Sequence, residues 1–267
     1  MNSGFAYCNV SIMPVRLEPS HRSEQVNQLL FGEKVEVIEI NKNDWVKIKG
    51  LFDGYMGWCK HSQLKNITRK EYLKATKCIV VSNNSKIIFG SAEADMPIGS
   101  ELTGFTGNKI ELQEEPGKFK GKKVLFSELQ QDFTSLSNAA MQYIYAPYQW
   151  GGRSIAGIDC SGLTQMAFKL CNIKLKRDAS QQAQQGVLVD FLQNSKPGDL
   201  AFFDDKEGKI IHVGILLDHQ TIIHASDTTG RVMIDRIDQG GIISLKLKKR
   251  THNLRVVKRI LKNIQTV

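Results

Sequence analysis

The stretch Gly157-Ile158-Asp159-Cys160-Ser161-Gly162-Leu163 decides the fold of the second half of this 267-residue chain. Residues with helical spacing follow it as far as Cys171, so we expect Cys160 to begin a helix. Asp159 is a suitable N-cap, because its side chain can accept a backbone N–H of the first turn. The N–H groups and the dipole of a helix start favour a thiolate, so the position suits a nucleophile. The alternative is that Cys160 is only a small buried apolar residue.

Two histidines on a later pair of predicted strands are candidates for the base that such a nucleophile needs. His212 and His224 lie in apolar runs on either side of the loop 218–220. A three-residue loop pairs Leu217 with Thr221 and makes the two histidines diagonal neighbours on one face. A two-residue loop would reverse that parity, so the spacing permits a Cys–His–His line without requiring it. Ordinary burial is the alternative for each ring. A metal pair is another, and we expect no metal because no third ligand lies nearby in sequence.

The remainder of the second half predicts an α+β domain, in which helices precede a run of antiparallel strands. Helical spacing predicts a helix over 132–145, before the one that Cys160 begins. Strands are predicted over 199–203, 210–217, 221–225 and 254–260.

The first half predicts small all-β barrels, because its strand-like runs are short and separated by turn residues. Such runs are found at 36–40, 44–48, 78–81 and 86–89. Glycine-containing turns follow the last two runs, which predict a second barrel; it is more diverged than the first, because the sequence Gly54-Tyr55-Met56-Gly57-Trp58 has no counterpart there. We therefore expect three domains, at residues 1–68, 69–128 and 129–267.

The composition is that of an ordinary globular protein, with 41% hydrophobic and 24% charged residues and a net charge of +9. The basic excess is densest between Lys246 and Arg259. We interpret it as solvated faces of edge strands and expect no nucleic-acid partner, since no nucleic-acid module accompanies it.

The five cysteines form no C-x-x-C pair, which argues against a structural zinc site or a disulfide framework and favours a reducing compartment. No run has the length of a membrane helix, and the first residues lack the apolar region of a signal peptide. We therefore expect no membrane span and a cytoplasmic location, or a periplasmic or envelope location if a leader is missing.

Six ordered motifs make residues 129–260 resemble the NlpC/P60 family, whose papain-like fold has a nucleophile opening a helix packed on an antiparallel sheet. The motifs are Pro147-Tyr148-Gln149-Trp150-Gly151-Gly152, Asp159-Cys160-Ser161-Gly162, Arg177-Asp178-Ala179, Lys196-Pro197-Gly198-Asp199-Leu200-Ala201-Phe202-Phe203, His212-Val213-Gly214 and Ile223-His224-Ala225. The resemblance implies that Cys160 attacks an amide carbonyl and that His212 is first its base and then the acid for the leaving amine. It also implies that His224 orients His212, and that Tyr148 and the backbone N–H of Cys160 stabilise the oxyanion.

Residues 26–59 resemble a bacterial SH3 domain. The landmarks are Leu29-Leu30-Phe31-Gly32-Glu33, Trp45-Val46-Lys47-Ile48 and Asp53-Gly54-Tyr55-Met56-Gly57-Trp58. The expected fold is thus a papain-like NlpC/P60 catalytic domain preceded by one or two small all-β SH3-like barrels. This order of domains resembles the YkfC-like group, which hydrolyses the γ-D-glutamyl bond to a diamino acid in murein peptides with a free N-terminal L-alanine.

The resemblance implies that Glu24, Tyr55 and Asp178 hold the free amine of the peptide, since a buried ammonium needs carboxylate partners. A solvated loop charge, a barrel-core ring and a local ion pair are the alternatives for these three residues. Asp159 and Ser161 flank the nucleophile and contact substrate, unless helix capping is their whole role.

The expected activity is cofactor-free hydrolysis of a murein tripeptide or a similar cell-wall peptide, in cell-wall recycling. A secreted D,L-endopeptidase or amidase acting on polymeric peptidoglycan is the alternative, because it shares the catalytic domain. The complete set of Cys160, His212 and His224 opposes a nonenzymatic wall-binding protein. Transpeptidation as a side activity stays open, and so does the choice between diaminopimelate and lysine.

Overall fold

The chain folds into two compact units in a computed structural model that describes residues 4–41, 43–105, 109–112 and 115–262. The first unit comprises Met1–Leu129 together with Trp150–Ser154, and the second comprises Gln130–Gln149 together with Ile155–Val267. Each unit has a hydrophobic core of its own. The parts of the expected domains at residues 1–3, 42, 106–108, 113–114 and 263–267 lie outside the described residues.

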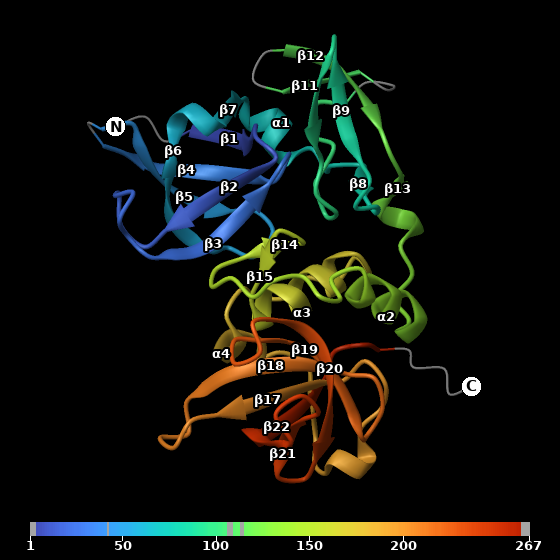
Figure 1. The fold of residues 1–267 in the computed structure, drawn as a ribbon. Coiled ribbons are helices and arrows are strands. Elements are labelled where there is room, and N and C mark those ends of the chain that lie inside the picture. The colour runs from blue at the N-terminus through green and yellow to red at the C-terminus, as the bar shows by residue number, and fades with distance from the viewer. Residues whose placement is uncertain (1–3, 42, 106–108, 113–114, 263–267) are drawn as a thin grey trace. The chain divides into compact units, whose positions relative to one another are not determined.

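A seven-stranded antiparallel sheet forms most of the first unit, in the strand order β3-β2-β6-β5-β4-β1-β7 (Figure 1). Its elements are β1 (Gly4–Cys8), β2 (Ile12–Arg16), β3 (Gln25–Leu30), β4 (Lys34–Ile40), β5 (Trp45–Gly50), β6 (Met56–Lys60), the 3-10 helix η1 (His61–Gln63), β7 (Leu64–Ile67) and α1 (Arg69–Leu73). Alternate side chains of these strands, such as Val35 and Val37, point into one core. The runs predicted at 36–40 and 44–48 correspond to β4 and β5.

Short strands make up the rest of the first unit. They are β8 (Cys78–Val80), β9 (Lys86–Phe89), β10 (Ala92–Asp95), β11 (Lys109–Leu112), β12 (Glu115–Lys120) and β13 (Lys123–Leu125), followed by η2 (Phe126–Glu128) and, later in the chain, β14 (Arg153–Ser154). Val80 and Ile87 from these strands pack in one cluster with Tyr7 and Phe31 from the preceding sheet. The shared cluster explains why all these strands fall in one compact unit. A domain boundary at residue 68 stays a prediction.

The segment Trp150–Ser154 folds with the first unit, although its flanking residues belong to the second. Arg153 and Glu33 are both buried and form a bidentate ion pair, with Nη1–Oε2 and Nη2–Oε1 distances of 2.7 and 2.9 Å. Gly151 has a φ of 73°, and a Cβ there would collide with the backbone of Gln25. The ion pair and the glycine therefore fix this segment within the first unit.

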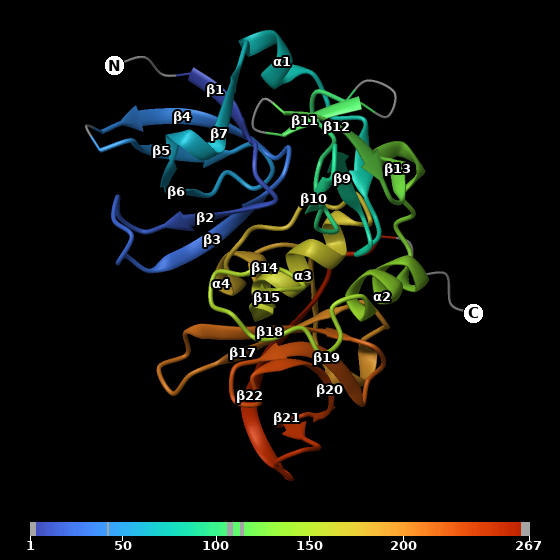
Figure 2. The same cartoon turned by 45° about the horizontal axis from the view of Figure 1, so that its top comes forward.

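The described part of the second unit contains three α-helices. They are α2 (Phe133–Met141), α3 (Cys160–Lys169) and α4 (Ala179–Gln182). The first two begin after Asp132 and Asp159, whose carboxylates each accept a first-turn N–H at 2.7 Å. All ten residues of α3 are buried, and the helix contacts α2 as well as β18 and β19 of the sheet described next (Figure 2).

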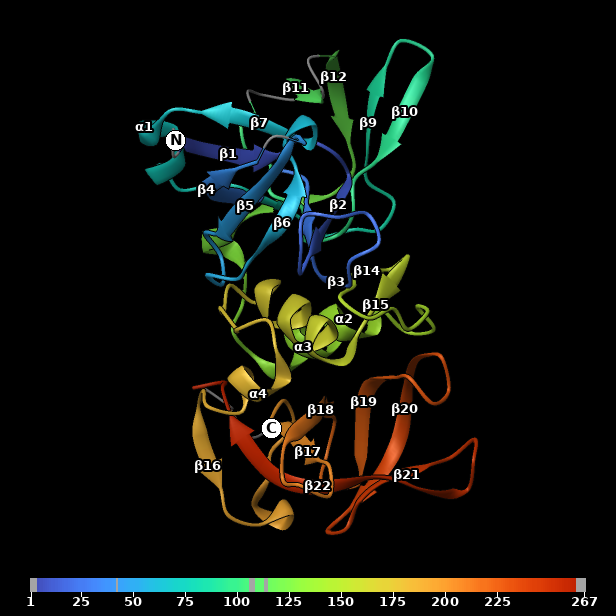
Figure 3. The ribbon, with the colours of Figure 1, turned by 90° about the vertical axis from the view of Figure 1, so that its left-hand side faces the viewer.

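Six antiparallel strands close into a barrel in the second unit, because β22 pairs with both β17 and β21 (Figure 3). The elements of this part are β15 (Gly157–Ile158), β16 (Val187–Val189), η3 (Leu192–Asn194), β17 (Leu200–Asp204), β18 (Ile210–Leu216), β19 (Thr221–Ser226), β20 (Arg231–Asp238), β21 (Gly241–Ser244) and β22 (Lys249–Arg259). β16 adds to the sheet by pairing with β22. The predicted α+β fold is confirmed. The predicted strands correspond to β17, β18, β19 and β22, whereas β20 and β21 were not predicted.

None of the helices in the described part of the chain has the length and apolar character that crossing a bilayer requires.

Candidate active site

Cys160 begins α3, with its sulfur buried against β18. Burial raises the pKa of this thiol to about 12, and the charge of Asp159 acts in the same direction. Hydrogen bonds with the backbone at Val213 of β18 and at Ser161 lower the pKa, but by less. The hydrogen bond with the backbone at Ser161 thus favours a thiolate, as expected of a helix start, but the sulfur loses more solvation than the backbone N–H groups replace, so the net shift favours the thiol.

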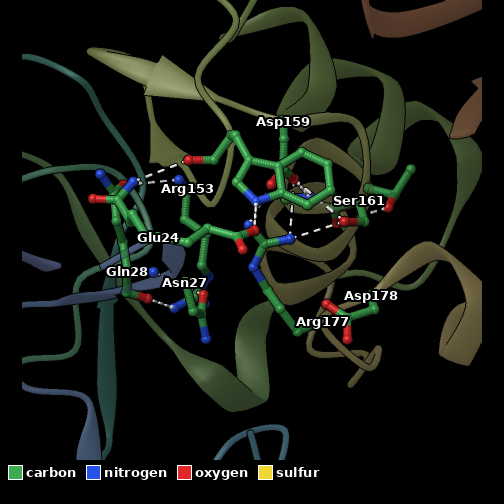
Figure 4. Close-up of polar contacts among 12 residues, drawn as sticks. Glu24, Asn27, Gln28, Arg153, Asp159, Ser161, Arg177 and Asp178 are labelled. Atoms are coloured by element: carbon green, nitrogen blue, oxygen red, sulfur yellow. Dashed lines mark hydrogen bonds and ion pairs between the residues drawn. The ribbon is translucent and has the colours of Figure 1, made fainter. Parts of the chain in front are cut away.

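A buried arginine stabilises the turn that presents Cys160. The guanidinium of Arg177 donates to both carboxylate oxygens of Asp159, at 3.0 and 2.6 Å, and to Oγ of Ser161 at 2.8 Å (Figure 4). Asp159 at the same time accepts the N–H of Gly162 as the helix N-cap. The capping role of Asp159 is confirmed, and a substrate contact of Asp159 or Ser161 stays a prediction. The charge of Arg177 lowers the pKa of the Cys160 thiol and so opposes the carboxylate.

His212 and His224 lie on the neighbouring strands β18 and β19. The backbone N–H of Leu217 donates to the carbonyl of Thr221, which confirms the three-residue loop and the predicted register. The two histidines are consequently diagonal neighbours, and Nε2 of His212 lies 2.9 Å from Nδ1 of His224. Both rings are buried, so this hydrogen bond satisfies polar atoms that water does not reach.

Burial lowers the pKa of His212 well below its ordinary value, and the neighbouring His252 and His224 lower it further. His212 is therefore neutral at pH 7 and has a lone pair with which to accept a proton. Since the thiol of Cys160 is protonated at the same pH, the resting state holds a neutral thiol and a neutral imidazole. An arrangement of this kind needs a base during attack, because little thiolate exists beforehand.

The second unit adds a carboxylate to this line that the sequence analysis missed. Oδ2 of Asp235, a buried residue of β20, lies 3.2 Å from Nε2 of His224. Its other oxygen accepts the backbone N–H of Leu245 at 2.7 Å. One signal was available: Asp235 has the strand parity of the apolar residues Met233 and Ile237, an unusual position for a charge on a half-buried strand.

A third histidine, also missed, stacks on the ring of His212. The rings of His212 and His252 have centroids 4.1 Å apart and an interplanar angle of 21°. Burial lowers the pKa of His252 to about 4, so this ring is neutral as well. His252 lies in the basic run that we interpreted as a solvated strand face, and its neighbours in sequence gave no sign of an inward ring.

Tyr148 lies on the chain that leads to the nucleophile. Its backbone N–H donates to Gly230 at 2.8 Å, and it forms a bridge with Ile158, two residues before Cys160. Burial raises the pKa of its hydroxyl, and the charge of Asp159 adds to this. The hydroxyl therefore stays protonated and can donate a hydrogen bond. A role for Tyr148 at the oxyanion stays a prediction.

The three residues predicted to hold a free amine are divided between the units. In the first unit, the exposed Glu24 accepts a hydrogen bond from the indole N–H of Trp150 at 2.5 Å, and the half-buried Tyr55 donates its backbone N–H to Asp53. In the second unit, the half-buried Asp178 is the N-cap residue of α4. Their binding of an amine stays a prediction.

Two family models match this chain. Residues 145–251 match the NlpC/P60 family, and residues 15–64 match the bacterial dipeptidyl-peptidase SH3 domain. The first match contains Tyr148, Cys160, His212 and His224, and the second contains Glu24 and Tyr55. Each match therefore covers residues that the sequence analysis selected.

Several curated proteins are similar over most of their length. A gamma-D-glutamyl-L-lysine dipeptidyl-peptidase of Bacillus subtilis is 30% identical, over 75% of this chain and 72% of that protein. One of Bacillus cereus with the same name is 28% identical, over 81% of this chain and 72% of that protein. Dipeptidyl-peptidase 6 of Lysinibacillus sphaericus is 24% identical, over 83% of this chain and 88% of that protein.

A solved structure shares the fold. It is an NlpC/P60 family protein of Bacillus cereus, with a TM-score of 0.79 and 19% identity over 96% of this chain and 99% of that one.

Proposed function

Because the chain belongs to the NlpC/P60 family of cysteine peptidases, we propose that it hydrolyses the γ-D-glutamyl–diamino acid bond of murein peptides that have a free N-terminal L-alanine. The main observation behind the proposal is the buried hydrogen bond of 2.9 Å between His212 and His224. His212 lies on β18, the strand whose backbone contacts the sulfur of Cys160. The names of the two Bacillus relatives support the choice of bond. The match to a dipeptidyl-peptidase SH3 domain supports a cut two residues from a free end.

In the first half of the reaction, Cys160 attacks the γ-carbonyl carbon of the D-glutamyl residue. His212 takes the thiol proton as the C–S bond forms, because the resting thiol is protonated and the resting imidazole is neutral. The imidazolium then gives that proton to the diamino acid nitrogen as the C–N bond breaks. The products of this half are a thioester on Cys160 and a free diamino acid.

In the second half, His212 takes a proton from water, and the resulting hydroxide attacks the thioester. The C–S bond breaks, the dipeptide leaves as a carboxylic acid, and the imidazolium of His212 returns its proton to the sulfur, which restores the thiol of Cys160. His224 orients the His212 ring through both half-reactions. The backbone N–H of Cys160 and the hydroxyl of Tyr148 stabilise the negative oxygen of each tetrahedral intermediate.

Selection of the free-ended peptide rests on Glu24, Tyr55 and Asp178. Two carboxylates and a phenol oxygen are suitable acceptors for the three N–H bonds of an ammonium group. An acylated alanine offers one N–H and no charge, so it leaves these acceptors unsatisfied. Polymeric wall is a poor substrate on this account, and small peptides released during wall turnover are the partners.

The setting that we propose is recycling of wall peptides in the cytoplasm. Its support is that all five cysteines are free thiols, which suits a reducing compartment.

The test compares three substrates at equal concentration: L-Ala-γ-D-Glu-L-Lys, the same peptide with an N-acetyl group, and intact sacculi. We expect the free peptide to give L-Ala-D-Glu and L-Lys, and acetylation to lower kcat/KM by about 100-fold, the equivalent of two unsatisfied hydrogen bonds. Replacing lysine by diaminopimelate measures the preference for the diamino acid. Cleavage of sacculi without cleavage of the free peptide would contradict the proposal and favour a wall endopeptidase.

A further inference from the structure

The hydrogen-bonded line in the barrel continues past the two histidines to a carboxylate. Strand pairing sets Ile222 opposite Asp235, which makes Asp235 a diagonal neighbour of His224. His224 has the same diagonal relation to His212 one strand earlier. Three adjacent strands, β18, β19 and β20, thus each contribute one residue to a line with successive contacts of 2.9 and 3.2 Å. All three side chains are buried.

The direction of the hydrogen bonds along this line follows from its end. An ionised carboxylate has only acceptor sites, and one oxygen of Asp235 already accepts the N–H of Leu245. The proton between Asp235 and His224 must therefore be on Nε2 of His224. A neutral imidazole carries one N–H, so Nδ1 of His224 is an acceptor and Nε2 of His212 is the donor to it.

This assignment leaves the lone pair of His212 on Nδ1, the nitrogen that His224 does not contact. That lone pair is what a base for the thiol of Cys160 requires. With the opposite direction, Nδ1 of His212 would carry the proton, and the ring would be unable to accept another there. The ability of His212 to accept a proton on Nδ1 thus depends on Asp235, which in the described contacts is hydrogen-bonded to His224 and not to His212 itself.

We propose that Asp235 is a positioning residue that fixes the tautomers of His224 and His212, so that His212 presents an unprotonated Nδ1 to Cys160. The inference rests on the proposed role of His212 as base. Asp235 touches neither substrate nor nucleophile in this scheme and acts only through His224. Removing the charge of Asp235 changes the tautomer of His212 and leaves its imidazole ring in place.

The other groups that surround His212, His224 and Asp235 do not determine which of these residues donates each hydrogen bond. His252 meets His212 through its ring face, at a centroid distance of 4.1 Å, and its Nδ1 contacts Oγ1 of Thr251 at 3.0 Å. Phe203 packs against the same two rings and carries no polar atom. Asp227 and Asp235 both act on His252 electrostatically, and of these two carboxylates it is Asp235 whose hydrogen bond to His224 is described.

The direct test reads the tautomers by long-range proton–nitrogen NMR on the full chain with ¹⁵N-labelled histidine. The chain has six histidines, and single His→Phe variants assign the signals of His212 and His224. At pH 7 we expect both rings to be neutral and protonated on Nε2. A proton on Nδ1 of His212, or an imidazolium at His224, would overturn the proposal. This measurement needs no substrate and no variant at position 235.

The second test compares Asp235→Asn with the matched control Asp238→Asn on the same strand, where the side chain is exposed and pairs with Arg250. The amide that Asp235→Asn introduces can donate to Nε2 of His224 and reverse the line. We expect kcat to fall by about 100-fold or more with KM changed by less than about threefold, and a new Nδ1–H signal from His212. The control keeps the kcat and the spectrum of the wild type.

The outcomes separate this inference from the proposed function. Asp235→Asn turning over at the wild-type rate with unchanged tautomers would overturn the inference and leave the peptidase assignment intact. Wild-type protein with the expected tautomers but no hydrolysis of the free tripeptide would support the inference and contradict the proposed substrate. If Asp235→Asn does not fold, the wild-type spectrum alone decides.

Discussion

Two buried cysteines, Cys8 in the first unit and Cys160 in the second, have similar thiols and different surroundings. Both are almost fully buried, and burial raises the pKa of both. Cys8 donates to the carbonyls of Val10 and Leu29 inside an apolar cluster. Cys160 lies against the strand that carries His212. Burial and a raised pKa are therefore common to both thiols, and in the proposed function the neutral imidazole of His212 is what makes Cys160, and not Cys8, the nucleophile.

The largest expected contrast comes from removing each sulfur in turn. Cys160→Ala should lower kcat for the free tripeptide by about 10,000-fold or more, because no group remains to form the thioester. Cys8→Ala should keep wild-type kcat and lose about 1–2 kcal/mol of unfolding free energy, through the small cavity left in the core. Steady-state kinetics and urea unfolding of both variants check this. Equal loss of turnover in the two would remove the distinction between the cysteines.

The next prediction tests whether His212 is the base that distinguishes Cys160 from Cys8. His212→Ala should lower kcat by about 1,000-fold or more, because both the thiol proton and the leaving amine lose their partner. His219→Ala is the matched control, since His219 lies in the loop that joins β18 to β19 and should leave kcat unchanged. A loss of less than tenfold in His212→Ala would contradict its assigned role.

The smallest effect concerns stability in acid, which the barrel histidines should control. The folded-state pKa values of His212 and His252 lie below the unfolded value of about 6.5. Below that pH the unfolded chain binds more protons than the folded one, so stability is full above about pH 6.5 and falls as the pH drops. His252→Phe should remove part of this loss, on the order of 1–3 kcal/mol at pH 4. Urea unfolding at pH 7 and pH 4 measures it. An unchanged loss would show that His252 is protonated in the fold.

The sequence predicted the main parts of this site because they depend on local signals. Asp159 before an apolar helix indicated the cap, and the loop 218–220 permitted the register that joins His212 to His224, which the family resemblance then favoured. Both signals act over a few residues, so one sequence is enough to interpret them.

What the sequence did not predict depends on contacts between distant strands. Asp235 joins His224 through β20, a strand that the sequence analysis did not predict, so the parity of Asp235 with its apolar neighbours was not used. His252 reaches His212 only because β22 completes the barrel. The net rise in the pKa of Cys160 was not predicted for a related reason, because the solvation of the sulfur depends on everything packed around it.

The most direct test of the central claim is to trap the acyl-enzyme. Wild-type protein is mixed with L-Ala-γ-D-Glu-L-Lys, and the reaction is quenched in acid within milliseconds to seconds. The protein is then digested, and the masses of its peptides are measured by mass spectrometry. The account predicts the mass of an L-Ala-D-Glu acyl group on the peptide that contains Cys160, and none on the peptides that contain Cys8 or Cys59. An acyl group on another residue, or hydrolysis that continues in Cys160→Ala, would contradict it.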